Sequence, residues 1–118
     1  MNQKQKGSRR ELELAHLIQD KGFKDAHRTQ QYCGDTSDNA ADVVGLPYIH
    51  IECKGTQVTN LNKFIKQAQR DAAKKKTDEL PTVFYKRDRE PWLVVMNVDD
   101  WFKLYETYLK SKENLWEI

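Results

Sequence analysis

The stretch DVVGLPYIHIECK, residues 42–54, constrains the fold of this chain more than any other segment. Its valines and isoleucines predict two β-strands, near 41–45 and 48–54. The sequence Gly45-Leu46-Pro47 between them predicts a tight turn, because glycine and proline interrupt regular structure. We therefore expect the two strands to form a hairpin.

The second of these strands carries two different rows of side chains, because neighbouring residues on a strand point to opposite faces. One row is apolar and predicts a core face: Ile49, Ile51 and Cys53. The other row is polar: His50, Glu52 and Lys54. A buried charge is costly unless it is paired or holds a metal, so the polar row points to a possible site.

A hairpin of this kind places Asp42 opposite or nearly opposite Glu52. Carboxylates opposed across a sheet repel one another, so a compensating positive charge is expected. Lys54 can supply part of it, and Mg²⁺, which binds one or two carboxylates and keeps several waters, would supply it better. Metal-bound water suits attack on a phosphate. The alternative is a surface strand on which Glu52 and Lys54 form a weak ion pair.

Glu11 fits two compatible interpretations. The sequence Ser8-Arg9-Arg10-Glu11 fits a capping box, in which the glutamate bonds back to the N-cap residue. Glu11 also shares a predicted helix face with Leu14, Ala15 and Ile18, at the edge of the buried stripe. From that edge its carboxylate can reach the sheet, whereas a cap alone does not require the side chain to turn inward.

The remaining patterns predict the order α-β-β-β-α-β-β-α, an α+β domain or a mixed sheet flanked by helices. Ser8 is the expected N-cap of the first helix, and a polar strand is expected over 23–32. A second helix is predicted over 60–76, with four residues on its inner side: Phe64, Ile65, Ala68 and Ala72. The segments PTVFYK and PWLVVMNV predict a second hairpin, after which Asp99 or Asp100 is expected to cap a last helix.

Length and composition predict a single domain, 1–118, because 38% hydrophobic and 32% charged residues are typical of a folded globular chain. No apolar run approaches the roughly 20 residues that span a bilayer. The N-terminal segment lacks the apolar stretch of a signal peptide, and Cys33 and Cys53 are expected to be reduced thiols. We therefore expect an intracellular protein.

The net charge of +2 does not by itself indicate nucleic-acid binding, but the basic residues are clustered. Lys4, Lys6, Arg9 and Arg10 crowd the start of the chain with no acid among them, and a second cluster lies within 63–76. Clustered lysines and arginines can contact phosphates. For the second cluster, an ordinary solvated helix face is an equally good interpretation.

Two segments, GSRRELELAHLIQDKGF and ADVVGLPYIHIECK, resemble the start and core of the PD-(D/E)XK nucleases, in particular the archaeal and phage Holliday-junction resolvases. The second half of the chain matches only in its order of elements. The resemblance implies a restriction-endonuclease-like core in which Asp42 and Glu52 bind Mg²⁺ or Mn²⁺. It also implies that Glu11 is a further acid near the metal and that Lys54 is catalytic. Ala41 stands where the proline of the family name would be, a departure that many members share.

The same resemblance implies further site residues. Resolvases carry a loop hydroxyl between the first two strands, for which Thr36 and Ser37 are candidates, although turn chemistry explains both equally well. Related nucleases keep a glutamine near the site on the next helix, where Gln67 stands. Arg9, Arg10 and the nearby lysines would hold flanking phosphates without reading base sequence.

A four-way junction has two-fold symmetry, so the resemblance also implies a homodimer that makes two matched cuts. Resemblance to phage enzymes implies action in a host cytoplasm. The large aromatic residues near the end of the chain fit either a dimer surface or the core: Trp92, Trp101, Phe102, Tyr105 and Trp116.

Two other functions stay open. The chain can be another PD-(D/E)XK endonuclease, of the repair, replication or restriction type, acting on branched or duplex DNA. It can also be a DNA-binding module that cuts nothing, although such a module has no need for Asp42, Glu52 and Lys54 together. The absence of a glycine-rich phosphate loop argues against a nucleotide hydrolase.

Overall fold

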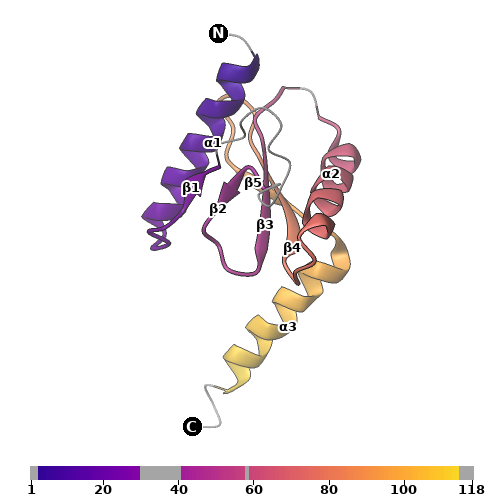
Figure 1. Ribbon diagram of the computed structural model, residues 1–118. Coiled ribbons are helices and arrows are strands. Elements are labelled where there is room, and N and C mark those ends of the chain that lie inside the picture. Colours follow the sequence, from indigo (N-terminus) through magenta and orange to yellow (C-terminus); the bar gives the residue numbers. More distant parts are fainter. Residues whose placement is uncertain (1–2, 30–40, 58, 115–118) are drawn as a thin grey trace.

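The computed structural model describes residues 3–29, 41–57 and 59–114 of the 118-residue chain. Within these residues three helices and five strands follow one another in the predicted order, α-β-β-β-α-β-β-α (Figure 1). Their bounds are α1 Gln3–Asp20, β1 His27–Arg28, β2 Val43–Val44, β3 Ile49–Lys54, α2 Leu61–Lys74, β4 Leu80–Tyr85, β5 Leu93–Val95 and α3 Val98–Asn114.

The strands form one mixed sheet in the order β1-β2-β3-β4-β5. Strands β3 and β4 are parallel, as expected for two strands joined through the helix α2, and the other neighbours are antiparallel. Helix α1 packs on β1–β3 and α2 packs on β3 and β4, so that the two helices flank the sheet (Figure 1). The predicted mixed sheet flanked by helices, a restriction-endonuclease-like core, is confirmed.

The alternation of β3 separates two cores. Ile51 and Cys53 are buried against α1, together with Leu14, Ile18 and Val43. The opposite face of the sheet packs on α2, whose inner side is lined as predicted by Phe64, Ile65, Ala68 and Ala72. Cys53 is buried in the first core with its thiol free, also as predicted.

The predicted start of the first helix is wrong. Helix α1 begins at Gln3 and continues through Gly7, so Ser8 lies within the helix and is not its N-cap. The Ser8 hydroxyl instead accepts a hydrogen bond from the Arg28 guanidinium at 3.0 Å, and the Glu11 carboxylate accepts a second from the same side chain at 3.1 Å. The capping box is therefore absent, and Glu11 is turned toward the sheet.

The second hairpin and the middle helix agree with the sequence prediction more closely. Strands β4 and β5 pair antiparallel around residues 86–92. The Asn60 side chain caps α2 by accepting a hydrogen bond from the Lys63 amide at 3.1 Å. The first predicted strand is described only as far as Thr29, where β1 spans two residues; its remainder and the polar loop that follows lie outside the described residues.

Helix α3 projects away from the sheet instead of packing on it (Figure 1). It begins at Val98, so Asp99 and Asp100 lie in its first turn and neither is the cap residue predicted for it. Carboxylates in a first turn still favour the helix through its dipole. Trp101, Phe102 and Tyr105 are exposed, whereas Trp92 is half-buried against the first core.

The described residues include no helix that is both long and apolar enough to cross a membrane.

Candidate active site

The hairpin register brings the two predicted carboxylates together. Val43 pairs with Ile51 in this antiparallel ladder, so Asp42 lies beside Ile51 and nearly opposite Glu52. The Asp42 backbone amide donates to the Ile51 carbonyl at 3.0 Å. Its carboxylate accepts from the Cys53 amide at 2.9 Å, which fixes the side chain beside β3. The arrangement expected from the turn is confirmed.

Glu52 is fully buried beneath α2, with a side-chain exposure of 0%. One of its oxygens lies 3.3 Å from Nε2 of His50, and the other has no hydrogen-bond partner among the described residues. Burial is the largest cause, and the nearby Asp42 carboxylate the next, of a pKa of Glu52 raised to about 10. In the absence of a cation, this group therefore holds a proton at neutral pH.

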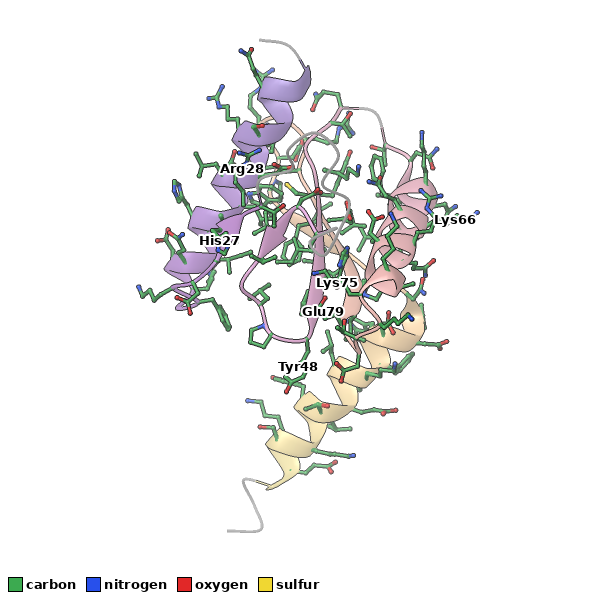
Figure 2. The ribbon with its side chains drawn as sticks, in the orientation of Figure 1. His27, Arg28, Tyr48, Lys66, Lys75 and Glu79 are labelled. Carbon is green, nitrogen blue, oxygen red and sulfur yellow. The ribbon has the colours of Figure 1, made fainter. Side chains whose placement is uncertain are left out.

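Glu11 reaches the same place from helix α1. Its side chain is 18% exposed, and its ion pair with Arg28 bridges α1 and β1. Figure 2 shows Arg28 lying against the helix. Burial, and next the charge of Asp42, raise the pKa of Glu11 above its ordinary value, although Arg28 and Lys54 oppose the shift. The Asp42 carboxylate therefore lies close enough to Glu11 to repel its negative charge.

A hollow of about 610 Å³ lies over these groups. Glu11, Asp42 and Lys54 line it, and so do Lys6 and Gln67 from the ends of the site. The Lys54 ammonium lies 5.4 Å from the centre of the Phe64 ring, so α2 and β3 together hold this side chain at the hollow. The structure thus brings four separately predicted residues, Glu11, Asp42, Lys54 and Gln67, to one surface, with Glu52 buried beside Asp42.

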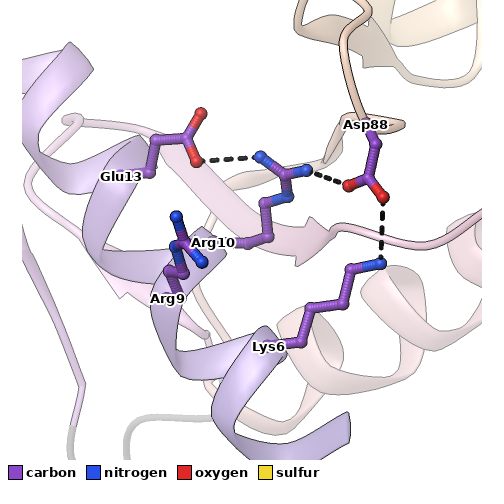
Figure 3. Close-up of a pocket in the computed structure, with 5 residues that line it drawn as sticks. All are labelled: Lys6, Arg9, Arg10, Glu13 and Asp88. Atoms are coloured by element: carbon purple, nitrogen blue, oxygen red, sulfur yellow. Dashed lines mark hydrogen bonds and ion pairs between the residues drawn. The ribbon is translucent and has the colours of Figure 1, made fainter. Parts of the chain in front are cut away.

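Two of the predicted DNA-contacting residues are engaged within the protein (Figure 3). The Arg10 side chain is 14% exposed, and its guanidinium bonds to Glu13 at 2.9 Å and to Asp88. Asp88 also accepts from the Lys6 ammonium at 3.5 Å. Arg10 therefore links α1 to the β4–β5 connection, whereas Arg9 is exposed beside it. The Lys4 side chain lies outside the described residues, as do both candidate loop hydroxyls, Thr36 and Ser37.

The second basic cluster, 63–76, is divided in the same way. Lys63, Lys66 and Arg70 are exposed on α2, and Figure 2 shows Lys66 pointing away from the molecule. Lys74 pairs with Asp71 at 3.4 Å, and Lys75 pairs with Glu79 at 3.6 Å.

Three residues around His50 and Glu52 were not assigned to the site from the sequence. His50, which the strand pattern placed on the same face as Glu52, is fully buried beside it. Burial, and next the charge of Lys75, lower the pKa of its imidazole, so the ring is neutral at pH 7. Asp71 and Glu79 face the same buried space. A signal for Asp71 was present, since it falls on the inner face of α2 beside Ala68 and Ala72.

Comparison with known proteins gives one match. A family model described as "Phage putative PDDEXK endonuclease" matches residues 2–117. No curated protein and no solved structure matches the chain. Because the family model spans almost the whole chain, this protein belongs to the PD-(D/E)XK superfamily, a group of nucleases that use divalent metals, and within it to the phage endonuclease family.

Proposed function

We propose that this protein is a Mg²⁺-dependent DNA endonuclease of one domain, and that its active site is the hollow over Asp42 and Glu52. The observation that carries the proposal is the place of Asp42 between two other carboxylates, Glu11 in the hollow and the buried Glu52, beside the ammonium group of Lys54. Carboxylates gathered in this way repel one another unless protons or a cation stand between them.

The donor set fits a hard divalent cation. Glu52 keeps one buried oxygen with no hydrogen-bond partner among the described residues, and the Asp42 carboxylate is its neighbour. Oxygen donors of this kind suit Mg²⁺, and Mn²⁺ is expected to substitute. Asp42 and Glu52 would hold the ion, with Glu11 at its edge. A bound cation would polarise the phosphate and lower the pKa of a water ligand.

The protein's own groups would position the DNA. Lys54 lines the hollow and offers a positive charge to a phosphate oxygen at the point where negative charge develops. Arg9 is exposed at the α1 side and would hold a flanking phosphate, together with Lys4. Lys6 and Arg10 would contact a phosphate in exchange for their ion pairs with Asp88 and Glu13. Gln67 on α2 would donate a neutral hydrogen bond from the opposite wall. The loop hydroxyl of Thr36 or Ser37 remains a proposal from the sequence alone.

We propose a four-way DNA junction as the preferred substrate. The proposal rests on the resemblance to the Holliday-junction resolvases, and on the absence of a zinc-finger spacing or an evident base-reading helix from the sequence. Contacts to phosphates alone favour recognition of DNA shape over base sequence.

The projecting helix α3 supports the homodimer that paired cuts require. Nine large apolar residues of β5 and α3 expose 40–68% of their surface: Leu93, Val94, Val98, Trp101, Phe102, Leu104, Tyr105, Tyr108 and Leu109. At about 150–250 Å² per large side chain, this is on the order of 800 Å² per copy, which is what each partner of a stable complex buries. A groove of about 460 Å³ between β5 and α3 offers a seat for the helix of a second copy.

The test is a cleavage assay on labelled DNA of different shapes. An immobile four-way junction and a linear duplex of the same sequence would be incubated with the protein in Mg²⁺ and in EDTA. Paired, symmetric nicks on the junction alone, lost in EDTA, are expected. Equal cutting of the duplex would keep the nuclease and overturn the junction assignment. Binding without cutting in Mg²⁺ or Mn²⁺ would overturn the nuclease.

A further inference from the structure

A second group of metal-ligating side chains lies under α2 and does not line the hollow. His50 and Glu52 come from β3, and Asp71 comes from the inner face of α2. One ligand atom from each of the three lies within 4.8 Å of the others. His50 and Glu52 have side-chain exposures of 0%, and Asp71 has 17%, so Asp71 forms the outer edge of the group.

Buried polar atoms of this group lack the hydrogen bonds that they would normally make. Among the described residues, Nδ1 of His50 and one carboxylate oxygen each of Glu52 and Glu79 have no hydrogen-bond partner. Leaving such atoms unpaired in a protein interior is costly, and most buried polar groups therefore have a partner. The Glu52 oxygen belongs to the group and points to a ligand there, whereas Nδ1 of His50 and the Glu79 oxygen face each other.

The His50 ring stands between two carboxylates. Its Nε2 faces Glu52 at 3.3 Å, and its Nδ1 faces Glu79 at 4.0 Å. A histidine that binds a metal through one nitrogen usually donates its other N–H to a carboxylate, which fixes the ring. Glu79 stands in that outer position and is held there by Lys75 at 3.6 Å. Figure 2 shows Lys75 and Glu79 side by side at the end of α2.

We propose that His50, Glu52 and Asp71 form a second cation site, with Glu79 as the outer carboxylate that orients His50. One nitrogen and two carboxylates suit a divalent transition metal such as Mn²⁺ or Zn²⁺ better than Mg²⁺, because imidazole is a softer donor than oxygen. The second site shares Glu52 with the proposed active site. Through that one shared residue, the inference rests on the proposed function. Asp42 belongs to the first site and Asp71 to the second.

The test counts and characterises bound Mn²⁺ in metal-free protein. Electron paramagnetic resonance gives the number of bound ions, and electron spin-echo modulation detects an imidazole nitrogen bound to Mn²⁺. The wild type is expected to hold an ion coupled to nitrogen. Asp71→Asn is expected to lower the affinity for that ion at least 10-fold. Asp42→Asn is expected to leave the coupling between nitrogen and Mn²⁺ in place.

Asp100→Asn is the matched control. Asp71 and Asp100 each pair with a lysine three residues later on a helix, at 3.4 and 3.7 Å, and their side chains are similarly exposed, at 17% and 15%. Both variants therefore lose a similar helical ion pair, and only Asp71→Asn should lower the affinity for Mn²⁺.

Two outcomes would overturn the second site. One is bound Mn²⁺ with no nitrogen coupling in the wild type, a result that needs no variant. The other is a wild-type affinity for Mn²⁺ in both Asp71→Asn and Asp100→Asn. Either outcome leaves the proposed nuclease standing, since that proposal is tested separately by DNA cutting in Mg²⁺.

Discussion

Folding favours the protonated form of Glu52, whereas the proposed binding of a cation needs its carboxylate. Burial and the Asp42 carboxylate raise its pKa to about 10, far above that of a glutamate in the unfolded chain. The folded protein therefore favours the protonated form. The stabilisation is complete below about pH 4.5, the unfolded value, and is lost as the pH rises toward 10. In metal-free buffer the protein should become less stable across this range.

Glu52→Gln should remove this pH dependence, because glutamine copies the shape of the protonated acid and never ionises. Near pH 7.5 the variant should be more stable than the wild type by roughly 1–4 kcal/mol. Urea unfolding in EDTA at pH 5.5 and 8.5 measures the change. Glu90→Gln, at an exposed position, is the control and should keep the wild-type pH dependence. Parallel pH profiles for Glu52→Gln and the wild type would contradict the assignment.

Residue-level prediction from the sequence worked where a strict spacing governs the geometry. The two-residue period of a strand and the short turn suffice to place Asp42 near Glu52 and both core residues, Ile51 and Cys53, on the other face. Asp71 was missed because its neighbours in QAQRDAAKKK are polar, which is typical of a solvated face. Its spacing from Ala68 and Ala72 places it on the inner face of α2, and the packing of α2 onto β3 brings it to His50 and Glu52.

At the scale of elements, Gly45 determines how closely the hairpin approaches the segment after α1. Its φ of +121° is one that side chains rarely adopt, and a Cβ there would lie 2.8 Å from the Ala26 backbone nitrogen. Gly22 has a similar φ of +110° with nothing within 4 Å of a Cβ. An alanine at Gly22 would therefore suffer backbone strain alone, whereas an alanine at Gly45 would suffer both backbone strain and a steric clash.

Gly22→Ala should cost about 1–2 kcal/mol of unfolding free energy, the penalty of a left-handed backbone alone. Gly45→Ala should cost clearly more, because the backbone of Ala26 must also move. Thermal unfolding of both variants tests the difference. Equal losses would mean that the hairpin does not depend on this close approach.

The order of elements was predictable because each strand and helix has its own local pattern, but two helix starts were not. Gly7 interrupts the helical pattern in the sequence, yet the lysines and glutamines before it are good helix formers and α1 runs through it. Asp99 and Asp100 both suit a cap, yet α3 begins at Val98, before either of them. Such boundaries depend on differences of about 1 kcal/mol, which neighbouring contacts easily reverse.

At the scale of the whole molecule, α3 gives the protein an extended shape. Its Cα radius of gyration is 15.4 Å, against about 13.5 Å for a compact domain of this length. The sequence could not decide whether the aromatic residues of α3 belong to a core or to an interface, because both environments favour them. Their exposure supports the interface, and hence the proposed dimer.

Phe102→Glu should dissociate that dimer, because it places a charge on the apolar face of α3. Thr107→Glu adds the same charge to the exposed helix at a polar position and should leave the dimer intact. Analytical ultracentrifugation of both variants and the wild type measures the mass in solution. A wild type that stays monomeric at micromolar concentration, or a Phe102→Glu protein that stays dimeric, would contradict this use of α3.

The most direct test of the central claim is the single-turnover rate of DNA cutting by Glu52→Gln in Mg²⁺, with Glu90→Gln as the matched control. If Asp42 and Glu52 hold the cation, Glu52→Gln should lose at least about 100-fold in rate while it stays folded and binds DNA as the wild type does. Glu90→Gln should cut normally. Wild-type cutting by a folded Glu52→Gln protein would contradict the account, because the buried carboxylate at its centre would then be dispensable.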